Sequence, residues 1–486
     1  MIRRALPLLI GALLLTPACG RHEQSGPIDV SVIGAPFAAV ADPDRATTST
    51  PDAILATATS QGLLRYDAAG QIVPGLAARW IVSENGRSLI FRLPDTANPA
   101  ALPVSSETIA RRLRAAIAPA SRNPLKPLLG AITDIDAVTP QVIDIELAAP
   151  RPNLLQLFAQ PELGVATRRG GGPFATIDRK PGLLTLRERP DPAIDRPNTK
   201  ILPTVIRLRS ERAGVAVARF MTGDARLVLG GGFADLPVAR AAAPPRGALH
   251  FDPVSGLFGL AFTHAESGFT ADAANRRALA MAIDRDRIAR LLAVPGWFPA
   301  TGIVARGTPE IAVPSVPDWS ASPIVDRQAE ARRIVFAGNK APTPLRIAMP
   351  AGPGARLLFA SIAADWRAIG VAAIAVGQGE PADLRLIDEV APADTAAFYL
   401  RSFACERNVP CTPESDTVLI GARAAPSLPR RTALLAQADS LIAQIAPFIA
   451  LGPPIRWSLV TPDLDLYRDS PRAIHPLNEL RTPSKR

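Results

Sequence analysis

The sequence predicts a multidomain protein of the α/β class. Its 486 residues correspond to about three domains of ordinary size. Hydrophobic residues make up 48% of the chain and charged residues 20%, which is typical of a globular protein. Residues 326–387 alternate helix-like and strand-like hydrophobic spacing. A strand–helix–strand unit in one sheet requires parallel strands and a right-handed crossover, so this segment indicates the class.

The first part of the chain is expected to alternate short strands and helices. Apolar residues at every second position predict a strand over 28–33, and helix-like spacing follows over 52–64. Two β-rich runs flank Asn85-Gly86, and both of these residues tolerate positive φ. We therefore expect a hairpin with a type I′ turn at this dipeptide.

Residues 65–160 are expected to form a small α+β unit that contains this hairpin. An amphipathic helix is predicted over 104–117, with Ser105 or Ser106 as its N-cap. Alternating apolar and acidic residues predict two half-buried strands, over 132–138 and 142–147.

The second half of the chain contains the longer helices. Apolar spacing predicts a single long helix over 272–292, and Asp326 is placed to cap a helix that Gly338 ends. The remaining elements expected are strands over 345–349, 371–376 and 384–387, and helices over 358–369 and 434–445.

The N-terminus resembles a bacterial lipoprotein signal. Arg3 and Arg4 precede a short apolar run over 6–15, and small residues lead to Cys19, which is the pattern of a secretory signal peptide. The apolar run is too short to cross a bilayer. The resemblance to a lipobox implies that residues 1–18 are removed and that the Cys19 thiol is acylated, which would hold the protein at a membrane surface. The alternative is an ordinary signal peptide followed by an incidental cysteine.

The two other cysteines, Cys405 and Cys411, lie in one polar loop. In an oxidising extracytoplasmic compartment they are expected to form a local disulfide. A catalytic thiol would require a nearby histidine. None of the histidines lies close in sequence, although closeness in space stays open; they are His22, His250, His264 and His475.

Charge and motifs argue against several other functions. The formal net charge is +10, but the arginines are scattered, without stacking aromatics or a nucleic-acid-binding signature. The Gly170–Gly172 and Gly230–Gly232 triplets lack the spacing of phosphate-binding loops, and no metal-ligand spacing occurs. We therefore expect no nucleic acid, metal or cofactor, and no enzymatic activity, while an enzyme with an unmarked site stays a third possibility.

A series of short segments resembles a known family. In chain order they are 62–80, Leu89-Ile-Phe-Arg-Leu93, Val104-Ser-Ser-Glu-Thr-Ile109, Gly171-Gly-Pro-Phe174, Arg276-Arg-Ala-Leu-Ala-Met-Ala-Ile-Asp284-Arg285, 326–338 and Asp365-Trp-Arg-Ala-Ile-Gly-Val371, with a weaker match over 415–452. This series is similar to the family 5 extracellular solute-binding proteins, the oligopeptide- and dipeptide-binding components of ABC importers.

The resemblance implies a two-lobed periplasmic-binding-protein-like fold of type II, with an extra α+β subdomain inserted in the first lobe. The expected division is a signal peptide (1–18), a lipidated tether (19–27), lobe I (28–64, 161–250 and 453–486), the subdomain (65–160) and lobe II (251–452). It also implies a periplasmic, lipid-anchored monomer that binds a peptide or another small polar solute and meets the permease subunits of a transporter.

The expected ligand site lies between the lobes, because open α/β sheets bind ligands beyond the carboxyl ends of their strands. Two segments that follow strands are its candidates: Phe262 and Thr263, and the acidic loop with Asp388, Glu389 and Asp394. An acidic loop would favour a cationic group such as a peptide amine. A solvated surface loop is the alternative.

The candidate site departs from the peptide-binding members of the family. Glu389 stands where the family has a Trp, Pro392 where it has an Asp, and Thr263 where it usually has an Asn. The family's His-Asp-Gly loop is replaced by residues 95–99. Two functions therefore compete within this fold: an importer's substrate-binding lipoprotein, and a repurposed envelope lipoprotein that takes no part in transport.

Overall fold

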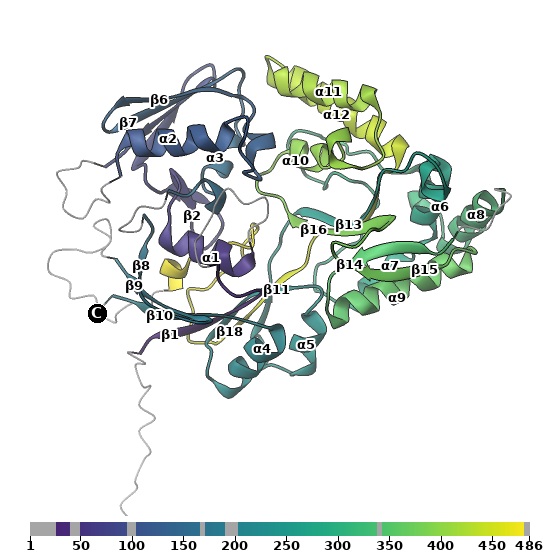
Figure 1. The fold of residues 1–486 in the computed structure, drawn as a ribbon, viewed down its shortest axis with the longest axis horizontal. Helices are drawn as coiled ribbons and strands as arrows, with labels where there is room; N and C mark the ends of the chain where they lie inside the picture. The colour runs from purple at the N-terminus through teal and green to yellow at the C-terminus, as the bar shows by residue number, and fades with distance from the viewer. Residues whose placement is uncertain are drawn as a thin grey trace, which may run out of the picture.

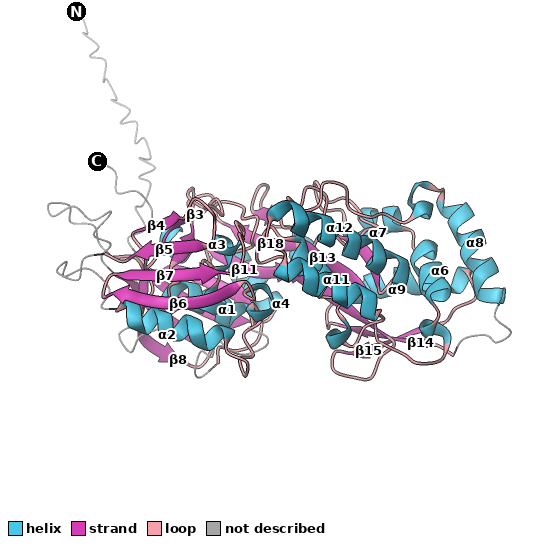
Figure 2. Ribbon diagram, turned by 90° about the horizontal axis from the view of Figure 1, so that it is seen from above, coloured by secondary structure: helices cyan, strands magenta, loops and turns pink. Residues whose placement is uncertain are grey.

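The computed structural model describes residues 26–38, 49–94, 104–165, 171–189, 203–337 and 343–480. The expected signal peptide, Cys19, the 95–99 loop and Gly338 lie outside these ranges. Figure 1 shows two bodies side by side, which we call lobe I and lobe II, with a smaller subdomain stacked on lobe I. Seen from above, the molecule is elongated, with the subdomain strands at one end and helices α6 and α8 at the other (Figure 2).

Lobe I is built on a seven-stranded mixed sheet. Its central strand β1 is buried along most of its length and runs parallel to β10 and β11, while the other pairings are antiparallel. The strands, in spatial order, are β12 (Leu249–Phe251), β18 (Arg456–Val460), β11 (Leu227–Gly232), β1 (Ile28–Ile33), β10 (Val205–Glu211), β9 (Leu183–Glu188) and β8 (Phe174–Lys180). Its helices are α1 (Thr50–Thr59), α4 (Ala213–Thr222) and α5 (Leu236–Ala241).

The subdomain is a four-stranded antiparallel sheet covered by helix α2 (Ser106–Ile117). Ser105 caps this helix by accepting a hydrogen bond from the Thr108 amide. The buried sides of α2 and of the sheet form one core, which includes Phe91, Ile109 and Ile143. The strands, in spatial order, are β4 (Arg79–Val82), β5 (Ser88–Arg92), β7 (Val142–Leu147) and β6 (Ile132–Thr139), and a short hairpin of β2 (Leu64–Tyr66) and β3 (Ile72–Pro74) with helix α3 (Leu154–Leu157) joins them to lobe I.

The β4–β5 hairpin is present, but its turn differs from the expected type I′. Only Gly86 has a positive φ, of 66°, and the Gly86 amide donates to the Ser83 carbonyl over 2.8 Å. Asn85 instead uses its side-chain oxygen to accept the Arg87 amide, which holds the backbone in a longer loop. One left-handed glycine after an ordinary turn is the alternative geometry for a short hairpin loop.

Lobe II contains the parallel unit that the sequence predicted. Strand β14 (Leu345–Met349) pairs in parallel with β15 (Ala373–Gly377), and helix α9 (Pro353–Ala368) connects them. This crossover confirms the α/β class. The sheet is completed by β16 (Leu384–Val390), β13 (Gly256–Phe262) and β17 (Phe448–Gly452), and the other helices are α6 (Ala273–Ala282), α7 (Arg285–Leu292), α8 (Ile324–Ala337), α10 (Ala396–Arg401), α11 (Pro413–Ala424) and α12 (Leu428–Ile445).

The single helix expected over 272–292 is wrong. The chain forms α6 and α7 with a break at Ile283, whose backbone is extended. The break is stabilised by Asp284, whose carboxylate accepts the Arg287 amide at 2.9 Å and so caps α7. Hydrophobic spacing continues through the break, and for that reason periodicity alone did not reveal it.

The chain passes between the lobes twice. It leaves the lobe I sheet after Phe251 and enters the lobe II sheet at Gly256, and it returns between Gly452 and Arg456. The expected division placed these passages after residues 250 and 452. The two crossing segments lie beside each other, and a few residues in such segments can absorb the rotation of one lobe against the other.

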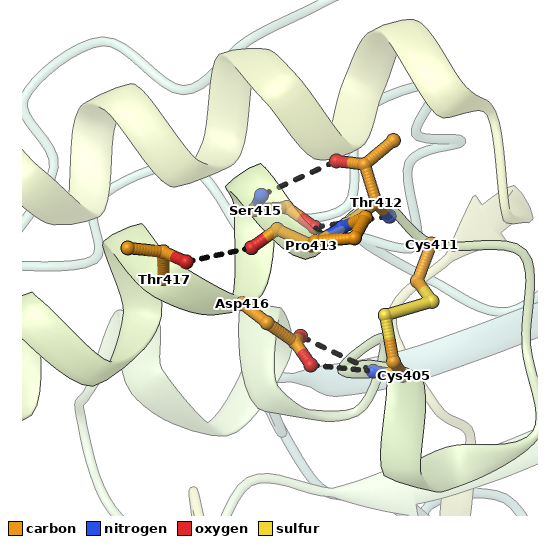
Figure 3. Close-up of a disulfide and its surroundings, with 7 residues drawn as sticks. All are labelled: Cys405, Cys411, Thr412, Pro413, Ser415, Asp416 and Thr417. Atoms are coloured by element: carbon orange, nitrogen blue, oxygen red, sulfur yellow. Dashed lines mark hydrogen bonds between the residues drawn. A yellow bond between two sulfur atoms is a disulfide. The ribbon is translucent and has the colours of Figure 1, made fainter.

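Cys405 and Cys411 form a disulfide at the cleft side of lobe II, with their Cα atoms 5.3 Å apart (Figure 3). The Cys405 amide donates to the Asp416 carboxylate at 3.1 Å, and Thr412 caps α11 by accepting the Ser415 amide. The loop between the two cysteines is therefore tied to the first turn of α11 at both ends.

Candidate functional site

A cleft of about 1690 Å³ lies between lobe I, the subdomain and lobe II. Lobe I contributes the ends of β11 and β18 and one side of α1, and the subdomain contributes the loop over 121–130. Lobe II contributes the end of β16 together with α10 and the disulfide loop. Strand ends from both lobes thus converge on one space large enough for a small solute.

The lobe I wall of the cleft combines a tryptophan with three glycines. A Cβ on Gly231 would lie 2.2 Å from the Trp457 ring, so only glycine fits there. The Trp457 Nε1 group donates to the Gly232 carbonyl at 2.9 Å, and Gly230 has a φ of 81°. The glycines of the 230–232 triplet, which do not have the spacing of a phosphate-binding loop, therefore allow β11 to pack closely against the Trp457 ring.

Asp388 and Glu389 both line the cleft, at the end of β16. The Asp388 carboxylate accepts Arg456 Nη1 of lobe I at 2.8 Å, and its backbone carbonyl accepts Arg456 Nη2 at 2.9 Å. Asp388 therefore links the two lobes. The Glu389 side chain is open to the cleft, but the surrounding protein removes part of its hydration and raises the pKa of its carboxyl, which the charge of Arg407 partly offsets.

Asp394 does not line the cleft and instead contacts the subdomain and the C-terminal segment. Its carboxylate accepts Gln156 Nε2 of the subdomain at 2.7 Å and pairs with Arg472 at 2.5 Å. Its backbone amide donates to the Gln156 side-chain oxygen at 2.6 Å. Because two donors of the chain occupy this carboxylate, it is a joint between lobe II, the subdomain and the C-terminal segment.

Phe262 and Thr263 lie away from the acidic residues. Strands β13 and β16 are antiparallel, so Phe262 pairs with Leu384 while Asp388 pairs with Phe258 at the opposite edge of the sheet. Phe262 is fully buried in the core, and the Thr263 hydroxyl donates to the Ala382 carbonyl. The two segments were expected to follow strands, but Phe262 ends β13 and Asp388 and Glu389 lie within the last residues of β16. Because the two strands run in opposite directions, they end at opposite edges of the sheet.

The comparisons with known proteins agree with this geometry. The family model "Bacterial extracellular solute-binding proteins, family 5 Middle" matches residues 71–386. The chain belongs to family 5 of the bacterial extracellular solute-binding proteins. A search among curated protein sequences gave no match.

Solved structures support the same fold for this family 5 protein. The murein tripeptide binding protein MppA of Escherichia coli is similar with a TM-score of 0.78 and 19% identity, over 92% of this chain and 97% of that one. OppA of Haemophilus influenzae in complex with RPPGFSPFR has the same TM-score, 16% identity and coverage of 92% and 97%. MppA in its unliganded open form fits less well, with a TM-score of 0.65 at 19% identity and coverage of 92% and 96%.

Asp252 and Asp235 are two further carboxylates that line the cleft of this family 5 protein. Asp252 accepts His475 Nε2 at 3.0 Å and the Ser470 amide at 2.8 Å, which anchors the C-terminal segment to the start of the first crossing. Asp235 lines the lobe I wall, where burial raises the pKa of its carboxyl. Within the ranges that the structure describes, no three His, Cys, Asp or Glu side chains are arranged to hold a metal ion.

Sequence reasoning missed the contribution of arginine to this cleft. Arg385, Arg401, Arg407 and Arg423 line it from lobe II, and Arg456 lines it from lobe I. They come from separate strands, helices and loops, so their spacing in the sequence does not indicate that they line the same cleft. The glycine triplet before Phe233 was visible in the sequence and could have marked the wall around Trp457.

Proposed function

We propose that this family 5 protein is the substrate-binding component of an ABC importer, which captures a small polar solute, peptides included, and delivers it to a membrane permease. The observation that supports this most directly is the cleft of about 1690 Å³ between two lobes that are joined by two adjacent crossing segments. Rotation about such a hinge would close the cleft over a solute, and the closed form would be the one that the permease recognises.

Two features support a closing motion. The protein is more similar to one structure of MppA than to the unliganded open form of the same protein. Lobe I and lobe II also touch beside the cleft, where the Gly354 amide at the start of α9 donates to the Ala234 carbonyl at 2.8 Å. We further propose that Cys19 anchors a periplasmic monomer to the membrane, which would keep it near its transporter at high effective concentration.

Native mass spectrometry of the processed protein, purified from a bacterial envelope, tests solute capture. The expected result is a one-to-one adduct of low mass that is released on denaturation and rebinds on refolding with an envelope extract. Gly232→Phe is the matched control, because a Cβ there meets nothing closer than Asp388 Oδ2 at 4.0 Å. The new ring would protrude into the cleft beside Asp388, so it should weaken retention of the adduct and leave the protein folded.

The repurposed envelope lipoprotein is the second candidate, and specific residues favour it. Glu389 and Pro392 stand where the peptide-binding members carry a Trp and an Asp, and Asp394 is used within the fold. If the wild-type protein captures no solute from any envelope or medium extract, the importer proposal fails and this candidate replaces it.

A further inference from the structure

The lobe II side of the cleft carries a cluster of like charges that we call the arginine wall. It consists of Arg385 on β16, Arg401 on α10, Arg407 in the disulfide loop and Arg423 on α11. Figure 1 shows α10 and α11 beside the subdomain, and residues of both helices line the cleft. Two glutamates, Glu389 and Glu406, stand among the four arginines, so the arginine wall keeps an excess of positive charge.

The arginines of the wall are close to one another and to the subdomain. Arg385 Nη2 donates to the Arg407 carbonyl at 3.4 Å, and Arg401 Nη2 pairs with Glu406 Oε1 at 3.5 Å. Arg423 Cδ lies 3.0 Å from the position of a Cβ on Gly130, in the subdomain loop that also brings Arg122 and Lys126 to the cleft. Basic groups therefore face this end of the cleft from both sides.

Of the four arginines, Arg401 pairs with Glu406, and the other three have no such pair in the described part of the chain. Among the described residues, no carboxylate oxygen lies within ion-pair distance of the guanidinium groups of Arg385, Arg407 or Arg423. Burial lowers the pKa of Arg385, and the charge of Arg407 lowers it further while Glu389 opposes both effects. Burial also lowers the pKa of Arg401, whose Nε is buried without a hydrogen-bond partner. A bound anion would relieve this repulsion and supply the missing acceptor.

The disulfide holds the backbone at one of these arginines. Arg407 lies between Cys405 and Cys411, and the next residue, Asn408, has a left-handed φ of 56° and accepts the His264 amide at 3.0 Å. The loop is thus held at the cysteines, at Asn408 and at Asp416. A guanidinium on such a loop loses less conformational entropy when it binds a ligand, which favours affinity.

We propose that the cleft takes a solute with an anionic group, a carboxylate or a phosphate, which Arg407 and Arg385 hold, and that the Cys405–Cys411 loop positions Arg407 for this contact. The inference rests on the proposed function, because it names the chemistry of the solute at the same site. It reverses the charge expected from the acidic loop alone. Asp388 is paired with Arg456 and Asp394 with Arg472, so of that loop Glu389 alone is left to face the four arginines.

Calorimetry with the processed full chain tests the charge preference. The probes are trialanine, trialanine amide, glutarate and inorganic phosphate, because the first two differ only in the carboxylate, and the last two separate carboxylate from phosphate recognition. We expect trialanine, glutarate or phosphate to bind at least about tenfold more tightly than the amide. Equal binding of trialanine and its amide with no binding of glutarate or phosphate overturns the inference, as does the failure of all anionic probes to bind at millimolar concentration.

Variants connect that preference to the arginine wall. Arg407→Gln should weaken binding of the tightest anionic probe at least about tenfold. Arg333→Gln is the matched control, because Arg333 is exposed on α8 at the far end of lobe II, away from the cleft. Cys405→Ser/Cys411→Ser should weaken the same probe while the thermal melt still shows a folded protein. Unchanged affinity in Arg407→Gln overturns the assignment.

The solute-capture experiment separates this inference from the proposed function. If the captured solute is neutral or purely cationic, the importer proposal stands and the anionic preference is overturned. Capture of an anionic solute by the wild type but not by the Arg407→Gln variant supports both the importer function and the anionic preference. If nothing is captured while glutarate or phosphate binds the arginine wall, the importer proposal fails and the anion site stands.

Discussion

Arg285 joins the break between α6 and α7 to the lobe II sheet. Its guanidinium is fully inside the protein and donates to the carbonyls of Ala280, Ala300 and Ala450 at 2.8–3.1 Å, and it lies over the Trp319 ring. Burial lowers the pKa of this group to about 9. The segment 276–285, which is part of the family resemblance, therefore ends in an arginine that donates to carbonyls far apart in the sequence.

Arg285→Met should destabilise the protein by about 3 kcal/mol, because it leaves at least two buried carbonyls without a donor. Urea denaturation followed by fluorescence measures this change. Arg277→Met is the control on the same segment, because Arg277 forms an exposed ion pair with Asp318, and such pairs contribute at most about 1 kcal/mol. Equal losses in the two variants would contradict the structural role of Arg285.

Glu389→Gln tests whether the ionised Glu389 carboxylate lowers the stability of the folded protein. The raised pKa means that the folded state binds the Glu389 proton more tightly than the unfolded state, whose carboxyl has a pKa of 4.5. The ionised form thus opposes folding at neutral pH. Glu389→Gln should raise the melting temperature at pH 7 slightly, because exposure of the side chain to the cleft limits the cost of its charge. The difference should shrink as the pH falls through 4.5, and a gap that stays constant down to pH 3.5 would contradict this.

Of the candidate ligand-binding residues taken from the sequence, Asp388 and Glu389 line the cleft, and their role in binding stays a prediction. Asp388 and Glu389 were found because they end a strand with clear hydrophobic alternation. Thr263 also follows such a strand, but the direction of β13 relative to β16 depends on pairing over more than a hundred residues, which no local pattern records. The same holds for Arg407 and Arg423, which become neighbours of Arg401 only through the packing of separate elements.

At the scale of elements, local chemistry decided where helices and strands begin and end. The expected N-cap at Ser105 is present, and Gly370 follows the end of α9 with a φ of 87°. The break at Asp284 and the turn at Asn85 were missed for one reason: in both, a polar side chain bonds to a nearby backbone amide. Such bonds compete with regular structure, and hydrophobic periodicity does not reveal them.

The loop between Cys405 and Cys411 offers a direct test at this scale. The denatured, unreduced protein should show no free thiol on titration with a thiol reagent, and two reactive thiols would contradict the disulfide. Closing a loop this short should contribute about 2–3 kcal/mol on the chain-entropy model. Cys405→Ser/Cys411→Ser should lose that amount of unfolding free energy, whereas reducing agent should have no effect on the stability of this variant.

For the whole molecule, the family resemblance predicted the two-lobed architecture, which hydrophobic periodicity did not indicate. Periodicity indicated an α/β domain near the centre of the chain, whereas a lobe assembled from three separated stretches requires pairing between β1, β11 and β18 across more than four hundred residues. Asp388 and Arg456 show the consequence for function. A strand end of lobe II and the first residue of a returning lobe I strand form an ion pair in the cleft, so any rotation of the lobes must move or break this contact.

The lipidated tether expected over 19–27 would determine where such a two-lobed protein can act. Cys19 follows a short apolar run and small residues, and its thiol is the expected lipid acceptor. Two or more acyl chains give stable membrane anchoring, because each buried CH₂ group contributes about 0.8 kcal/mol. Cys19→Ser should therefore yield a soluble or unprocessed protein without radioactive palmitate. Ser25→Ala, in the same tether, should stay in the membrane fraction and carry the label. A Cys19→Ser protein that still incorporates palmitate and sediments with membranes would show that the anchor lies elsewhere, and the tethered receptor would have to be abandoned.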